Sequence, residues 1–110
     1  MPTTFKHAIN TAIGTVPADV VTIPIDTRAT VIGCNLVNVT ESVITASVFV
    51  IGSDTTLSYY AKDVIIPPDT TLKVITQGEK LILPENTGLR VVSNTEDSID
   101  ATISYVEITT

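Results

Sequence analysis

The chain has 110 residues, of which 44% are hydrophobic and 16% are charged, so it is too apolar and too weakly charged for a disordered protein. Its formal net charge is -6, and it contains 3 tyrosines, 2 phenylalanines and no tryptophan, which excludes the basic, aromatic surface that binds nucleic acid. No apolar run approaches the roughly 20 residues that a membrane-spanning helix needs.

The apolar side chains are mostly β-branched. The sequence has 14 valines, 14 isoleucines and 19 threonines, against 6 leucines and 7 alanines. Because β-branched side chains are stiff and pack well on a pleated surface, this composition predicts an all-β domain. The single cysteine excludes an internal disulfide, so the hydrophobic core must supply the stability. The polar start of the chain is unlike a secretory signal, and we expect a soluble protein with no membrane partner.

Turn residues recur about every 8–12 residues, which is typical of a sandwich or barrel of short strands. We expect about eight short strands. The runs between the turns give nine candidate ranges for them: 6–13, 20–25, 30–39, 43–51, 57–66, 72–76, 80–83, 89–93 and 98–108. A turn is expected at Gln77-Gly78-Glu79, between the sixth and seventh ranges.

The last range, 98–108, has the clearest alternation. Ile99, Ala101 and Ile103 fall on one face of the predicted strand, as expected for a half-buried strand. Val106 and Ile108 then fall on the opposite, outward set. This change indicates either a β-bulge or a strand end that a neighbouring chain covers.

These ranges predict one antiparallel β-sandwich domain over residues 1–110, either a jelly roll or an immunoglobulin-like sandwich. Residues 1–10 overlap the first candidate range, 6–13, but precede the first strong strand, and we treat them as a candidate extended arm. Within this arm Phe5, Lys6 and His7 are candidate interface residues, because they offer one large apolar and two polar side chains near the chain start.

The sequence contains no catalytic or cofactor-binding motif. His7 is the only histidine, so it is the only imidazole base that a catalytic triad could use. Cys34 lies on the apolar alternation of its strand, which indicates a buried structural thiol. Three pairs of nearby acidic residues lack the spacing of a calcium-binding loop, and we interpret them as solvated turns. They are Asp97 with Asp100, Glu96 with Asp97, and Asp63 with Asp69. We therefore expect no enzyme, no cofactor and no metal site.

Tyr59 and Tyr60 are adjacent in the predicted strand 57–66, with Lys62 nearby. Adjacent side chains of a strand point to opposite faces, so one tyrosine is expected in the core and the other at the surface. The exposed tyrosine is a candidate interface residue, since tyrosine provides a large contact area with few rotatable bonds. A surface tyrosine without a role is the alternative interpretation.

Most of the chain resembles a group of small virion structural proteins of tailed bacteriophages. The order of several short segments and the Ser-Tyr-Val-Glu-Ile ending carry the resemblance. The segments are Thr30-Val31-Ile32-Gly33, Asn35-Leu36-Val37-Asn38, Tyr59-Tyr60-Ala61-Lys62, Ile66-Pro67-Pro68, Leu72-Lys73-Val74, Gly78-Glu79-Lys80-Leu81-Ile82-Leu83, Gly88-Leu89-Arg90-Val91-Val92-Ser93 and Ser104-Tyr105-Val106-Glu107-Ile108.

The resemblance implies a non-enzymatic β-sandwich that is made in the host cytoplasm and built into the phage particle. The favoured role is a capsid decoration or cement protein on the head surface, which binds the major capsid protein and forms homo-oligomers, with trimers favoured. A tail, baseplate, neck or fibre component is the alternative within the virion. A carbohydrate-binding or receptor-binding sandwich is a third hypothesis, which needs an exposed aromatic platform or a calcium cluster.

Overall fold

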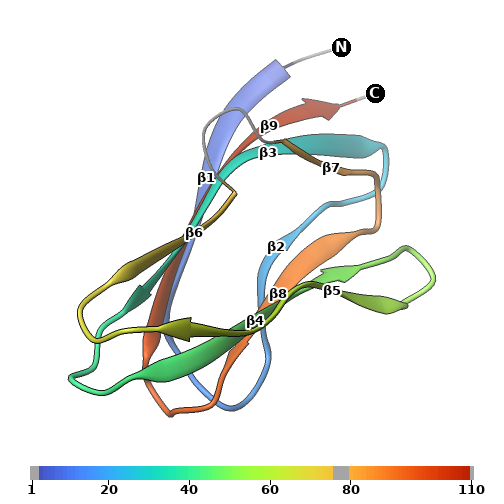
Figure 1. Cartoon of the computed structure of the whole chain (residues 1–110). Helices are drawn as coiled ribbons and strands as arrows, with labels where there is room; N and C mark the ends of the chain where they lie inside the picture. The colour runs from blue at the N-terminus through green and yellow to red at the C-terminus, as the bar shows by residue number, and fades with distance from the viewer. Residues whose placement is uncertain (1–2, 76–79, 110) are drawn as a thin grey trace.

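The computed structural model describes residues 3–75 and 80–109, and these residues form nine antiparallel strands (Figure 1). The strands are β1 (Thr3–Ile13), β2 (Ala18–Thr22), β3 (Thr27–Asn38), β4 (Ile44–Ile51), β5 (Leu57–Ile66), β6 (Thr71–Ile75), β7 (Leu81–Leu83), β8 (Gly88–Ser93) and β9 (Ile99–Thr109). The predicted all-β sandwich is confirmed. In the described part of the chain no helix is long and apolar enough to cross a membrane. The turn expected at Gln77-Gly78-Glu79 and the end of the sixth range, Thr76, lie outside the described residues.

The strands form two sheets that face each other (Figure 1). The first sheet has the order β1-β9-β3-β6, with β7 also paired to β3, and the second sheet has the order β2-β8-β4-β5. The first four strands of the chain therefore alternate between the sheets, and the last two again lie in different sheets. This order is that of an eight-stranded jelly roll with β7 as a short addition, and it decides between the two sandwich types that the sequence left open.

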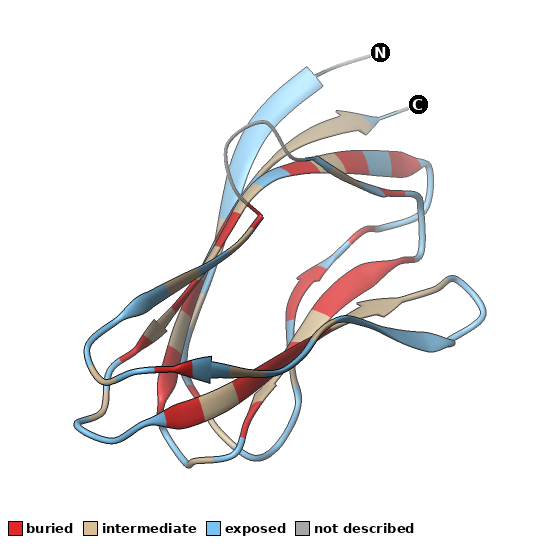
Figure 2. Ribbon diagram, viewed as in Figure 1, coloured by how far each residue is buried: buried red, intermediate tan, exposed pale blue. Residues whose placement is uncertain are grey.

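Buried residues, which are red in Figure 2, occur in both sheets. The core lies between the sheets and is built from their inward-facing side chains. Nearly all of these side chains are aliphatic, so the β-branched composition fills the space that a two-layer fold must close. The most deeply buried residues include Ile23, Val31, Leu36, Ile44, Val48, Ile66, Leu83, Leu89, Val91, Ile99 and Ile103.

The outward position of Val106 and Ile108 does not come from a bulge in β9. The pairing of β1 with β9 runs without a break from Thr3–Ile108 to Asn10–Ala101. The register shift between β3 and β9 falls between Val31 and Gly33, so the extra residue is in β3. The alternation in β9 therefore continues to its end, and the bulge that the sequence suggested for β9 is wrong.

One buried polar side chain, Asn38 at the end of β3, connects three segments. Its Nδ2 donates hydrogen bonds to the carbonyl oxygens of Ser42, Ile66 and Pro67 at 2.8, 3.0 and 3.1 Å. Its Oδ1 accepts hydrogen bonds from the backbone N–H and the hydroxyl of Thr40 at 2.9 and 2.7 Å. Asn38 is 0% exposed, so these bonds replace all contact with water and fix the β3–β4 loop against the β5–β6 turn.

Candidate functional site

A row of outward-facing side chains crosses the first sheet at the end where β1 begins. Directly paired residues project from the same face, and the register joins Phe5 of β1 to Val106 of β9, Val106 to Thr30 of β3, and Thr30 to Ile82 of β7. Thr30 lies between the buried Ala29 and Val31, so this face is the outer one. We call these four residues the Phe5 row.

The Phe5 row places large apolar groups in solvent. Phe5 is 79% exposed and Ile82 is 69% exposed. Ile9, which follows Phe5 by four residues on the same outer face of β1, is 63% exposed. In Figure 2 the first part of β1 is pale blue, the colour of exposed residues. Large apolar side chains exposed on an outer sheet face are typical of an interaction surface.

The candidate interface residues of the expected arm are divided between the two faces of β1. His7 shares the outer face with Phe5, whereas Lys6 pairs with Tyr105 and lies on the opposite face. The Lys6 ammonium lies 2.9 Å from Glu107 Oε1, and this hydrogen bond together with the charge of Glu107 raises the pKa of Lys6. Residues 3–10 belong to the sheet, so an arm that docks on another subunit, which stays a prediction, would begin from an edge strand.

A second row crosses the outer face of the second sheet. The register joins Asp19 of β2 to Arg90 of β8, Arg90 to Phe49 of β4, and Phe49 to Tyr59 of β5. We call these four residues the Tyr59 row. Arg90 Nε lies 2.7 Å from Asp19 Oδ1, and the Phe49 and Tyr59 ring centroids are 4.5 Å apart at 34°. The Lys62 ammonium lies 5.2 Å from the Tyr59 ring centroid, within the range of a cation–π contact.

The expectation that one of the two adjacent tyrosines lies in the core is wrong. Tyr59 is 52% exposed and Tyr60 is 37% exposed. The reason is a register shift: Val48 pairs with Ala61 and Phe49 with Tyr59, so Tyr60 has no opposite residue in β4. The simple alternation of faces fails at such a bulge. Phe49, which the sequence analysis did not select, is the residue that orders the Tyr59 ring, and only the register reveals this contact.

The two groups of candidate residues do not come together. Phe5, Lys6 and His7 lie on an edge of the first sheet, and Tyr59 and Tyr60 lie on an edge of the second (Figure 1). The structure therefore presents two separate surfaces rather than one site.

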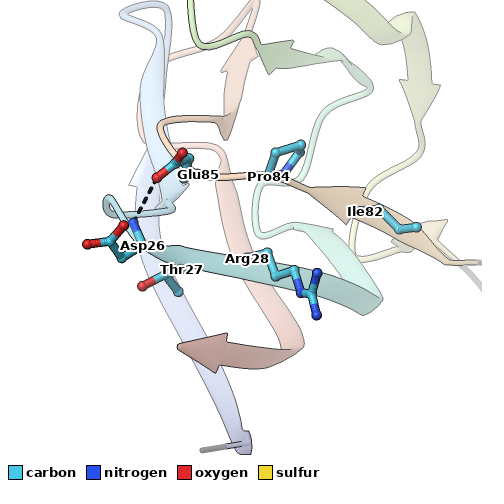
Figure 3. Close-up of a pocket in the computed structure, with 6 residues that line it drawn as sticks. All are labelled: Asp26, Thr27, Arg28, Ile82, Pro84 and Glu85. Carbon is cyan, nitrogen blue, oxygen red and sulfur yellow. Dashed lines mark hydrogen bonds between the residues drawn. The ribbon is translucent and has the colours of Figure 1, made fainter. Parts of the chain in front are cut away.

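An open pocket of about 390 Å³ lies beside the β2–β3 turn, lined by Asp26, Thr27, Arg28, Ile82, Pro84 and Glu85 (Figure 3). The backbone N–H of Asp26 donates to Glu85 Oε2 at 2.8 Å. Asp26 has a φ of 58°, in the left-handed region that aspartate tolerates in turns. Glu85 thus holds two turns together, which is a structural role.

Among residues 3–75 and 80–109 no three His, Cys, Asp or Glu side chains gather as metal ligands would. Several acidic side chains instead hold turns. Asp100 Oδ1 accepts the backbone N–H of Ala12 at 3.1 Å, where the register between β1 and β9 shifts, and Glu96 accepts the Thr15 hydroxyl. Asp63 exchanges hydrogen bonds with Ser47 across the β4–β5 hairpin.

The interpretation of Cys34 as a buried structural thiol is confirmed. Its side chain is 0% exposed within the core, and burial raises the pKa of the thiol to about 11. A thiol that is buried and protonated neither reacts nor binds metal readily.

We expect native protein to resist alkylation at Cys34 and to react fully when unfolded. The raised pKa also predicts a pH effect, because above pH 9 the unfolded chain loses its thiol proton while the folded chain keeps it. The free energy of unfolding of the natural chain, measured relative to Cys34→Ala, should be constant below pH 8. It should fall by roughly 1.4 kcal/mol by pH 10. Rapid alkylation of the native protein or a flat difference up to pH 10 would contradict the buried position.

Comparisons with known proteins support the fold. No protein-family model matches the chain, and no curated protein matches it in sequence. The chain is similar in structure to a subunit of Bacillus endospore appendages, described as a novel family of disulfide-linked pili, with a TM-score of 0.55 and 11% identity. This match covers 98% of the chain and 87% of the pilus chain.

A second solved structure with the same type of fold is the T13 viral particle of IBDV, infectious bursal disease virus, at a TM-score of 0.50 and 13% identity. The match covers 97% of this chain but 31% of the viral chain, so the chain spans about a third of that protein. At these identities the likeness establishes a shared β-sandwich, in agreement with the jelly-roll strand order.

Proposed function

We propose that this protein is a non-enzymatic structural component of a tailed-bacteriophage virion, and that it decorates the outer surface of the head. The observation that carries the proposal is the pair of outward rows, which place large apolar side chains on the outer faces of both sheets. A freely diffusing monomer has little use for two such surfaces, whereas a subunit of a particle must contact neighbours on more than one side.

Two further observations support this role. The described parts of the segments that resemble phage virion proteins fall mainly on β3, β5, β6, β7, β8 and β9, so they follow the framework of the sandwich rather than one loop. The similar solved structures are a viral particle and a pilus, both of which are assemblies of repeated subunits. The disulfide linkage of the pilus does not carry over, because Cys34 is the only cysteine and is buried.

Within this proposal the Tyr59 row is the surface that contacts the capsid. It combines a tilted ring pair and the Arg90–Asp19 ion pair with the ammonium of Lys62, in a chain whose net charge is -6. A half-exposed tyrosine that is already ordered by a neighbouring ring loses little conformational freedom on binding. A lattice surface with acidic and apolar groups would be complementary to it.

Co-sedimentation with empty capsids of the cognate phage tests the proposal. We expect saturable binding of hundreds of copies per particle and greater thermal resistance of the filled shells. Tyr59→Ala should weaken binding by about tenfold or more. Val16→Ala removes a comparably exposed apolar group from the β1–β2 connection and should leave binding unchanged.

The outcomes separate the alternatives. Absence of the protein from capsids, with a small multiple of three or six copies in whole virions, would overturn the head location and place the protein in the tail, baseplate, neck or a fibre. Absence from virions altogether would overturn the virion role. Binding of the same strength by Tyr59→Ala would show that the capsid contacts another surface.

A further inference from the structure

The free edge of β1 differs from the other sheet edges in the described part of the chain. Exposed strand edges are commonly protected from pairing by short length, bulges, prolines or charges. The strands β2, β6 and β7 have five, five and three residues, and β2 lies between Pro17 and Pro24. The edge strand β5 contains two register shifts, with Asp63 at a φ of 48°.

Between Thr3 and Asn10 none of these devices protects β1, whose register shift lies farther along, between Asn10 and Ile13. It has 11 residues, contains no proline or acidic residue, and pairs with β9 in one continuous register from Thr3 to Asn10. Its one lysine, Lys6, is engaged by Glu107 of the same chain. A long, regular edge with apolar side chains is a template for pairing with another strand.

We propose that this edge pairs with β1 of a second copy, in an antiparallel, two-fold seam. Charge favours a second copy at this place. Each chain carries a net charge of -6, so two copies repel each other over most of their surface, but the first acidic residue along the sequence is Asp19, beyond β1. β1 itself therefore adds no acidic side chain to this repulsion, and Glu107 on the neighbouring β9 is paired with Lys6.

The side chains of β1 select one register. When His7 lies opposite His7 of the second copy, Phe5 lies opposite Ile9 of the second copy, and the symmetry repeats this pair. Aromatic and β-branched side chains stabilise a sheet when they lie directly opposite each other. A centre at Lys6 would instead place two lysines face to face, and a centre at Ala8 would pair Phe5 with Thr11.

The size of the seam sets its strength. About seven residues of each copy, Thr4 to Asn10, would pair. The area that they bury would be smaller than the roughly 800 Å² per partner of a standard interface. We therefore expect a dimer of micromolar affinity. One strand edge accepts one strand, so this seam gives a dimer, and a trimer would need another surface. Dimerisation through β1 goes beyond the virion role and does not depend on it.

Sedimentation equilibrium over a wide concentration range tests the seam in the purified protein. We expect a reversible monomer–dimer equilibrium, with the dissociation constant raised about tenfold or more in Phe5→Asp. Val43→Asp is the matched control, because it places the same charge on an exposed apolar residue of the β3–β4 connection, which belongs to neither row. The control should dimerise like the natural chain.

A cysteine scan tests the register. His7→Cys places two thiols at the two-fold axis, where paired residues are close enough for a disulfide, so mild oxidation should trap the dimer. Thr11→Cys would separate the thiols by roughly 26 Å, at about 3.3 Å per residue, and should remain unlinked. Cys34 is buried in both variants and does not compete.

Three results would overturn the proposal: a monomer at all concentrations, equal loss of the dimer in Phe5→Asp and Val43→Asp, or equal crosslinking of the two cysteine variants. A trimer that Phe5→Asp leaves intact would also overturn it. None of these readings depends on capsid binding, so failure of the seam and failure of the virion role are distinguishable.

Discussion

Replacement of Asn38 by aspartate is expected to lower the free energy of unfolding by about 3–5 kcal/mol, a large share of the stability of a domain of this size. The change is nearly isosteric, but it replaces a donor of three hydrogen bonds by a carboxylate oxygen. That oxygen would face the carbonyls of Ser42, Ile66 and Pro67 without access to water. Urea denaturation should show a midpoint lowered by about 2 M.

The control for this variant is Asn35→Asp, which makes the same chemical change on the same strand. Asn35 is only half-buried and shares the outer face with Lys73, so the new charge keeps contact with water and we expect a change within about 0.5 kcal/mol. The deficit of Asn38→Asp should also shrink as pH falls from 7 to 5. Burial favours the protonated form of the new carboxyl, so the pKa of this group is higher in the folded chain than in the unfolded chain. The variant therefore loses folding free energy as pH rises and regains it as pH falls. Equal stability of the two variants would contradict the assigned network.

Replacement of Gly88 by alanine is expected to cost about 2–3 kcal/mol, for a steric reason. Gly88 pairs with Thr22 of β2 and with Ile51 of β4, and an added Cβ would lie 2.4 Å from the carbonyl oxygen of Val21. The obstacle is backbone, which cannot rotate away, so β2 and β8 must separate. Thermal unfolding should show a midpoint lowered by about 10 °C.

Gly33→Ala is the matched control, because Gly33 is also a strand glycine and its added Cβ would meet only Ser104 Cβ at 3.9 Å. This is an ordinary packing distance, so we expect a change within about 0.5 kcal/mol. If both alanine variants unfold at the same temperature, the close approach of β2 to Gly88 is wrong.

The two outward rows lie on opposite outer faces of the sandwich, which makes the chain a two-sided building block. The Tyr59 row is ordered by ring stacking and an ion pair, and the β1 edge offers backbone groups as well as side chains. Different chemistry on the two surfaces allows one to bind a different protein and the other to bind a second copy, so mutations can separate the two activities.

Local patterns predicted several features because they depend on neighbouring residues alone. The strand 57–66 was predicted with the bounds that β5 has, since the turn residues on either side stop the pattern. Burial of Cys34 followed from its place on the apolar alternation. The outward position of Val106 and Ile108 was also visible, but the sequence could not tell whether a bulge or a regular strand produced it.

Features that depend on the register between strands could not be predicted from the sequence. Tyr60 was assigned by strict alternation, which the bulge opposite Val48 and Phe49 breaks. The importance of Asn38 was hidden because its three acceptors lie on the β3–β4 loop and on residues 28 and 29 positions away. The partner of Tyr59, Phe49, belongs to another strand, and no local pattern indicates which residues two strands place opposite each other.

The sequence by itself determined that the chain is a β-sandwich with a β-branched core, a single buried thiol and more apolar surface than one small core uses. Composition and alternation suffice for these properties because each residue contributes to them independently. Only the tertiary structure decided the jelly-roll order, the two rows and the free edge of β1. Each of these requires strands distant in sequence to pair in one register, and pairing is a property of the whole sheet.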